Sequence, residues 1–176
     1  AGITAGMAAG MTMATARGST AVGDKLVVGL IGCGGRGSYL VGRFAARPDV
    51  DVKYVCDADR RRHGRGGAAV DSGGGKTPRG ISGFRKMLDD PEVDIVINAT
   101  PDHWHGLGTV LACQAGKHVY VEKPVSHNIW EGRQMVKAAR KYKRIVQAGM
   151  QNRSADYVRN AVDLVQSGKL GVVHTV

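Results

Sequence analysis

The sequence predicts an α/β fold: a doubly wound, mostly parallel sheet, followed by the start of a truncated second α/β domain. Apolar runs typical of buried strands alternate along the chain with segments of helical periodicity. A glycine-rich turn follows the first apolar run directly, and the second apolar run ends at an acidic residue. With 176 residues and an apolar fraction of 43%, the chain is long enough for one domain with a real core.

The first strand–helix–strand unit carries the strongest motif. Leu26 to Ile31 is a short apolar run that predicts a buried strand, and residues 32–37 fit the spacing G-x-G-x-x-G. A helical segment and a second strand, 51–56, follow, and this strand leads to Asp57. Such an order of strand, glycine turn, helix, strand and acid is the dinucleotide-binding fingerprint of a Rossmann sheet.

Each part of the fingerprint has a physical role toward a dinucleotide. The first glycine permits the tight turn, the second lets the backbone approach a pyrophosphate, and the third allows the helix to pack on the strand. The free N–H groups at the helix start attract phosphate, and the acid accepts hydrogen bonds from the ribose. We therefore expect the cofactor to contact Gly32, Gly34, Gly35, Arg36, Gly37 and Asp57.

Cofactor choice follows from the residues after the second strand. The Asp57 carboxylate repels a 2′-phosphate and favours NAD, whereas Arg60, Arg61 and Arg62 lie close behind and would accommodate NADP. NAD is the prediction, with NADP possible. The alternative for the whole motif is a glycine turn that binds no nucleotide.

The remaining elements are expected in this order. From Gly64 to Gly80, seven residues are glycine, which predicts a long mobile loop. Phe84, Met87 and Leu88 then indicate a short helix. Beyond it we expect a strand at 94–100, a helix at 101–116, strands at 118–121 and 144–149 with a helix between them, a last helix ending at Gly168, and the beginning of a strand at 172–176.

Two helix starts carry capping signals. Asn128 with Glu131 resembles a capping box, and the helix behind it is expected to bury Ile129, Met135, Val136 and Ala139. Ser154 is expected to cap the last helix.

Charge and cysteine content exclude several classes of protein. The net charge is +10, but the basic residues are scattered apart from the cluster at 60–65, and no nucleic-acid-binding signature accompanies them. No nucleic-acid partner is therefore predicted. Cys33, Cys56 and Cys113 have no C-x-x-C spacing and are expected to be buried thiols rather than a disulfide framework.

The first residues resemble an export signal. Ala1 to Ala16 contain no charge, and Ala14-Thr15-Ala16 matches the A-x-A cleavage pattern. A periplasmic or otherwise exported protein is predicted; the alternative is a disordered tail on a cytoplasmic protein. The segment is too short and too rich in glycine for a membrane span.

Three later motifs make a family resemblance specific. Ala99 to His105 (ATPDHWH), Ala115 to Pro124 (AGKHVYVEKP) and Gly149 to Ser154 (GMQNRS) resemble the glucose–fructose oxidoreductase / inositol dehydrogenase (Gfo/Idh/MocA) family, in its exported bacterial branch. The resemblance spans residues 25–176. It implies a Rossmann domain at 25–153 after an N-terminal segment 1–24, with 154–176 as the connecting helix and first strand of a C-terminal substrate domain.

The resemblance also implies site residues. The cofactor site would be lined by Thr100, Pro101 and His105, and Glu122-Lys123-Pro124 would lie beside the nicotinamide. The substrate would meet Lys123, Gln151 and Arg153. Asp102 stands where the family more usually has Asn. The resemblance further implies a sugar or polyol substrate and a homo-oligomer built through the C-terminal domain.

Lys123 is the predicted catalytic residue. A rim lysine can hold the hydroxyl oxygen of a sugar, and partial burial beside the positive nicotinamide would lower its pKa. The alternative is a surface lysine at a strand end. His103 and His105 do not indicate a metal, because residues two apart on a helix do not face each other and no third ligand is evident.

The leading functional hypothesis is an NAD(P)-dependent oxidoreductase that transfers a hydride between a sugar or polyol hydroxyl and nicotinamide. A second is an NAD-dependent glycosidase that oxidises the sugar transiently, and a third is a non-catalytic dinucleotide-binding protein. The residues given are expected to be inactive without the C-terminal domain.

Overall fold

Six parallel strands form one sheet in the order β3-β2-β1-β4-β5-β6 within residues 25–172 and 174, which the computed structural model describes. The strands are β1 (Leu26–Ile31), β2 (Val50–Cys56), β3 (Arg79–Ile81), β4 (Ile95–Asn98), β5 (His118–Glu122) and β6 (Val146–Gly149). Every neighbouring pair is parallel. The α/β Rossmann prediction is confirmed, and each expected strand of the domain is present.

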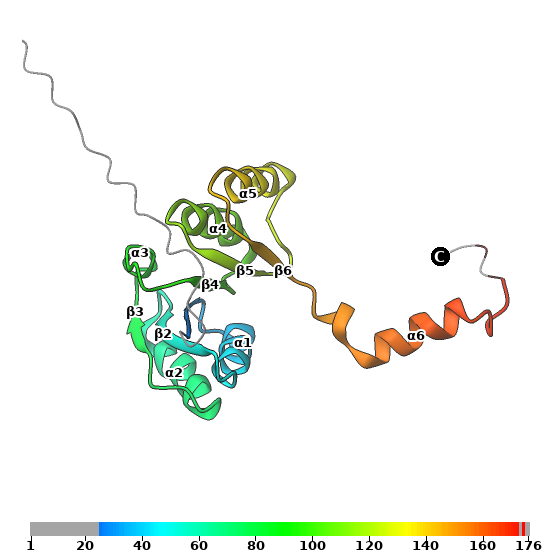
Figure 1. Cartoon of the computed structure of the whole chain (residues 1–176), viewed down its shortest axis with the longest axis horizontal. Helices are drawn as coiled ribbons and strands as arrows, with labels where there is room; N and C mark the ends of the chain where they lie inside the picture. Colours follow the sequence, from blue (N-terminus) through cyan, green and yellow to red (C-terminus); the bar gives the residue numbers. More distant parts are fainter. Residues whose placement is uncertain (1–24, 173, 175–176) are drawn as a thin grey trace, which may run out of the picture.

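Helices cover both faces of this sheet (Figure 1). They are α1 (Gly35–Ala45), α2 (His63–Ser72), α3 (Arg85–Leu88), α4 (His105–Gln114), α5 (Ile129–Lys141) and α6 (Asp156–Gln166), with short 3₁₀ turns η1 (Arg60–Arg62), η2 (Asp102–Trp104) and η3 (Gln151–Ser154). The pair α1 and α2 lies on one face, and the pair α4 and α5 on the other.

Each face has its own apolar core. On one side, Leu40 and Val41 of α1 pack with Val28 and Leu30 of β1. Leu40 is 6% exposed, and the other three residues are fully buried. On the other face, α4 and α5 pack against β4 and β5. Burial of such an aliphatic side chain contributes about 1.5–3 kcal/mol. These two cores hold the central strands β1 and β4 rigidly beside each other.

The segment predicted as a mobile loop contains a helix, so that prediction is wrong for residues 63–72. Close packing accounts for Gly66 of this helix. A Cβ at Gly66 would lie 3.0 Å from Cys33 Sγ, and one at Gly42 of the neighbouring α1 would lie 2.9 Å from the Ala69 carbonyl oxygen. Glycine at these two positions lets α2 approach the glycine turn and α1, and that tertiary gain outweighs the low helix propensity of glycine.

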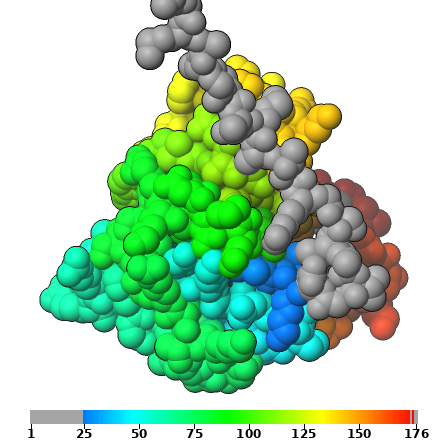
Figure 2. All heavy atoms as spheres, turned by 60° about the vertical axis from the view of Figure 1, so that its left-hand side comes forward, coloured from blue at the N-terminus to red at the C-terminus, as the bar shows by residue number. Residues whose placement is uncertain are grey.

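The loop that follows α3 is bonded to β2 through Asp90. Tyr54 Oη donates to Asp90 Oδ2 over 2.7 Å, and Lys53 Nζ lies 2.6 Å from the same oxygen. In Figure 2 the green segment around α3 covers this side of the molecule beside the cyan residues of β2. The polar contacts fix the loop that leads into β4.

The N-cap half of the expected capping box before α5 is confirmed, and the expected buried face is only partly right. Asn128 Oδ1 accepts from the Glu131 amide over 2.9 Å, whereas Glu131 Oε1 accepts from the Asn128 side-chain amide and not from its backbone. Met135 and Ala138 are buried, whereas Ile129 is 87% exposed and Val136 40% exposed.

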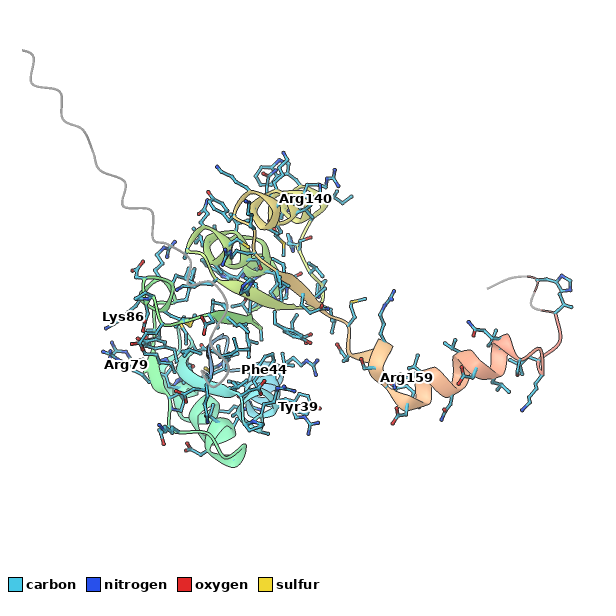
Figure 3. All side chains as sticks on the ribbon, viewed as in Figure 1. Tyr39, Phe44, Arg79, Lys86, Arg140 and Arg159 are labelled. Carbon is cyan, nitrogen blue, oxygen red and sulfur yellow. The ribbon has the colours of Figure 1, made fainter. Side chains whose placement is uncertain are left out.

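The last helix differs from expectation at its start. Ser154 belongs to η3, Ala155 is the N-cap of α6, and no side-chain hydrogen bond caps the helix. The predicted strand 172–176 is not seen at Val172 and His174, and its other residues lie outside the described part. Along α6, no residue is buried, and the helix projects from the sheet with Arg159 pointing into solvent (Figure 3).

The signal-like segment Ala1 to Ala16 lies outside the described residues, and export stays a prediction. Among residues 25–172 and 174, no helix has the length and apolar character needed to cross a bilayer.

Candidate functional site

The glycine turn stands at the carboxyl end of β1, between β2 and β4. Gly32 has φ +93°, and its amide donates to the Cys56 carbonyl over 2.8 Å. A Cβ at Gly32 would lie 2.5 Å from the Ala99 carbonyl oxygen, and one at Gly37 would lie 1.8 Å from the Gly32 carbonyl oxygen. The turn therefore needs glycine at both positions, as the fingerprint predicts.

Gly34 has a different environment. A Cβ there would meet no atom within 4 Å, and Gly34 is the N-cap of α1 in a helix start that has no side-chain cap and no acidic residue in its first turn. The N–H groups of that turn and the helix dipole face open space, which suits an anionic group such as a pyrophosphate.

Asp57 closes the other side of the turn. Its Oδ2 accepts from the Cys33 amide over 2.9 Å, and its Oδ1 accepts from the Asp59 amide over 3.0 Å. The carboxylate thus shapes the glycine turn as well as facing the cavity, a role that the sequence does not reveal. Burial, and then the nearby Asp57 charge, raises the pKa of the Cys33 thiol to about 12, so this cysteine is an unreactive packing group.

A cavity of about 890 Å³ lies over these strand ends. Seven of the predicted cofactor residues line it: Gly32, Gly34, Gly35, Arg36, Asp57, Thr100 and Pro101. It has the size of a small-molecule site and lies where the strand order reverses between β1 and β4, the place where ligands bind in open α/β sheets. These residues fit NAD: open backbone for phosphates and a carboxylate for a ribose.

The second wall of the cavity was not predicted. It comes from the segment Ser82–Lys86 and from His103 and Trp104. The Phe84 and Trp104 rings meet edge to face with centroids 6.4 Å apart. Lys86 lies with Arg79 at the outer edge of the sheet (Figure 3). The signal available in the sequence was Trp104 itself, a large aromatic residue in the turn between β4 and α4.

Asn98, the last residue of β4, was also missed. It is fully buried and lines the cavity. Its Oδ1 accepts from the Thr100 hydroxyl over 2.8 Å, and its Nδ2 donates to the His105 carbonyl over 3.2 Å. A polar residue that ends an apolar strand is the sequence signal for such a role.

The arginines at 60–62, which follow Asp57, differ in their contacts. Arg61 is paired with Asp59, with Nη2 and Oδ2 2.9 Å apart, and it does not line the cavity. Arg62 lines the cavity. Of the three arginines weighed for NADP, Arg62 is the one placed to meet a ligand.

Six predicted site residues lie outside the cavity wall: Gly37, which packs within the glycine turn, His105, Glu122, Lys123, Gln151 and Arg153. Glu122 is 3% exposed and binds Arg36, and Lys123 is exposed, so the expected partial burial of Lys123 is wrong for this structure. Lys123 precedes a cis peptide bond to Pro124. Gln151 and Arg153 are exposed in η3, beyond the end of β6, and their role in substrate binding stays a prediction.

His105 is the remaining predicted cofactor residue, and it does not line the cavity. Its side chain is 1% exposed, and both ring nitrogens face backbone carbonyls, those of Thr100 and Pro124. The alternative reading of a histidine bonded to backbone describes it correctly. Among the described residues 25–172 and 174, no group of three or more His, Cys, Asp and Glu side chains is arranged to hold a metal ion.

Comparisons with known proteins agree with this geometry. The model of the oxidoreductase family GFO_IDH_MocA, NAD-binding Rossmann fold, matches residues 26–150. A glycosyl hydrolase family 109 protein of Shewanella sp. (strain ANA-3) is 36% identical over 112 residues, which is 61% of this chain and 25% of the relative.

Solved structures show the same fold. The WlbA dehydrogenase from Bordetella pertussis, in complex with NADH and UDP-GlcNAcA, aligns with TM-score 0.72 and 26% identity over 85% of this chain and 42% of its own. The myo-inositol 2-dehydrogenase from Lactobacillus plantarum aligns with TM-score 0.70 and 25% identity over 85% and 43%. The chain thus spans about a quarter to under half of the length of these proteins.

Proposed function

We propose, from the premise that the chain belongs to the GFO_IDH_MocA oxidoreductase family with an NAD-binding Rossmann fold, that the whole protein transfers a hydride between a sugar or polyol hydroxyl and NAD. The cavity over β1, β2 and β4 carries the proposal. It combines an uncapped helix start at Gly34 with the Asp57 carboxylate, and both belong to the family motif.

Substrate class is proposed from the relatives. One solved neighbour is a dehydrogenase in complex with NADH and UDP-GlcNAcA, and another is a myo-inositol dehydrogenase. Both names indicate oxidation at a sugar or polyol. Gln151 and Arg153 follow the end of β6 at the same rim and are the proposed substrate contacts.

Lys123 is the proposed catalytic residue. Bound NAD would supply the hydride acceptor. Lys123 follows the last residue of β5, at the carboxyl edge that carries the cavity, and its side chain is free of the core. Its Nζ would hydrogen-bond the substrate hydroxyl oxygen and stabilise the negative charge that develops there as the proton leaves.

The test of the cofactor proposal is calorimetric titration of this chain with NAD and with NADP. Binding of NAD, with weaker binding of NADP, is the expected result, because the Asp57 carboxylate repels a 2′-phosphate. A folded circular-dichroism spectrum on a sample that binds neither nucleotide would overturn the proposal.

A glycosidase is the second candidate, and the glycosyl hydrolase family 109 relative favours it. Such an enzyme oxidises the sugar transiently and regenerates its NAD, so no net NADH accumulates. Steady NADH production in the whole protein with a sugar or polyol supports the dehydrogenase. Release of an aglycone without NADH supports the glycosidase. Homo-oligomer formation and export stay predictions.

A further inference from the structure

One buried imidazole joins the two rim loops that follow β4 and β5. His105 Nε2 lies 2.8 Å from the Thr100 carbonyl oxygen, and Nδ1 is hydrogen-bonded to the Pro124 carbonyl oxygen. Thr100 borders the cavity, and Pro124 directly follows Lys123. The ring therefore ties the cavity wall to the loop that carries the proposed catalytic lysine.

The ring is also shielded from solvent. A backbone carbonyl oxygen accepts hydrogen bonds and an imidazole N–H donates them, so the ring meets both rim loops through their main chains. His105 is 1% exposed, and a buried polar ring keeps its hydrogen-bond partners because losing them is costly.

Two further contacts surround the backbone of His105. Asn98 Nδ2 donates to the His105 carbonyl oxygen, which fixes the backbone beneath the ring. Glu131 Oε2 is buried and has no hydrogen-bond partner among the described residues. It packs against Gly106, where a Cβ would lie 2.9 Å from it, so a carboxylate oxygen stands next to the residue that follows His105.

We propose that His105 is a positioning residue: a buried clasp that holds the Lys123–Pro124 loop against the loop after β4 and so places Lys123 for reaction. This rests on the catalytic role proposed for Lys123. Without the clasp, the contacts that remain on the loop include the Lys123 amide, which donates to Glu122 Oε2 over 3.1 Å, and the exposed pair of His127 and Asp102.

The chain offers a matched control histidine. His127 Nδ1 lies 3.2 Å from Asp102 Oδ2 and links the same two segments, η2 and the residues after β5. Its side chain is exposed and its partner is a side chain, so solvent replaces that contact readily. H127Q should therefore leave the loop in place.

The test compares H105F and H105Q with H127Q. Both His105 variants should raise amide hydrogen exchange at Lys123 about tenfold to a hundredfold, the factor that corresponds to losing the buried hydrogen bonds of the ring. H127Q should change it by less than about twofold. Equal exchange at Lys123 in H105F and the unaltered chain would overturn the proposal.

In the whole protein, the His105 variants should lower kcat by about tenfold or more with little change in the KM for sugar, because the catalytic group and not the binding surface is displaced. Unchanged kcat with raised exchange at Lys123 would overturn the positioning role. If the unaltered chain fails to bind NAD, the proposed function fails, while the exchange data still decide whether the clasp exists.

Discussion

Arg36 and Glu122 lie 86 positions apart, and the Arg36 guanidinium donates to Glu122 Oε1 over 2.8 Å. The pair joins the first turn of α1, on the cavity wall, to the last residue of β5. The Glu122 side chain is 4% exposed and that of Arg36 is 35% exposed. Breaking this pair therefore leaves a buried carboxylate without its cation.

We expect R36A to lower the free energy of unfolding by about 2 kcal/mol, less than the loss of a fully buried pair because Arg36 is one-third exposed. Urea denaturation measures it. R43A removes an exposed arginine from the same helix and is the control. Equal stability of the two variants would contradict a structural role for the pair.

Asp57 should matter for stability as well as for NAD. In D57A the amides of Cys33 and Asp59 lose their acceptor, so we expect a loss of about 1–3 kcal/mol besides weaker NAD binding. Thermal unfolding and calorimetry measure the two effects separately. D89N, which alters an exposed carboxylate, should show neither. Weaker binding with unchanged stability would show that the turn keeps its shape without the carboxylate.

Lys123 should affect turnover alone. Its side chain is exposed, so K123A should leave thermal stability and NAD affinity unchanged while turnover of the whole protein falls about a hundredfold or more. The control K137A removes an exposed lysine on α5. If K123A and K137A turned over substrate equally fast, Lys123 would have no catalytic role.

Acid should weaken the contact that Asp90, in the loop after α3, makes with Tyr54 and Lys53 of β2. Burial of Asp90 opposes ionisation, but hydrogen bonds from Lys53, the Glu92 amide and Tyr54 outweigh it and lower the pKa of Asp90 to about 2. A depressed folded-state pKa stabilises the protein above the unfolded pKa of about 4 and loses that contribution as pH falls to about 2.

The contribution of Asp90 is about 2 kcal/mol. Urea denaturation of D90N between about pH 2 and pH 5 should therefore show a flatter dependence of stability on pH than the unaltered chain. Parallel curves for the two proteins would mean that another group governs the acid transition.

Local patterns were sufficient to predict the frame of the domain. The run Leu26 to Ile31, the glycine spacing and the apolar strands all describe short stretches whose periodicity reflects their burial. Their parallel pairing follows from alternation with helices. Residues 63–72 were missed because glycine was weighed by its local flexibility, whereas Gly66 is set by contact with Cys33 and Val55.

The sequence alone could not predict which side chains from distant elements contact one another. The motif placed Glu122 and His105 at the correct rim, but it does not show that Glu122 binds Arg36 or that His105 binds two carbonyls. Phe84 and Trp104 meet only because the segment after β3 and the loop after β4 share one edge. Such contacts depend on strand order.

The order of strands also dictates when the site can exist during synthesis. β1 pairs with β2 on one side and with β4 on the other, so the first strand to leave the ribosome waits for residues 95–98 before its second edge is filled. The glycine turn is made early, but its opposite wall arrives with Thr100 to Trp104. A nascent chain therefore lacks a complete nucleotide site until residues 100–104 have emerged, which couples the first binding of cofactor to completion of the central sheet.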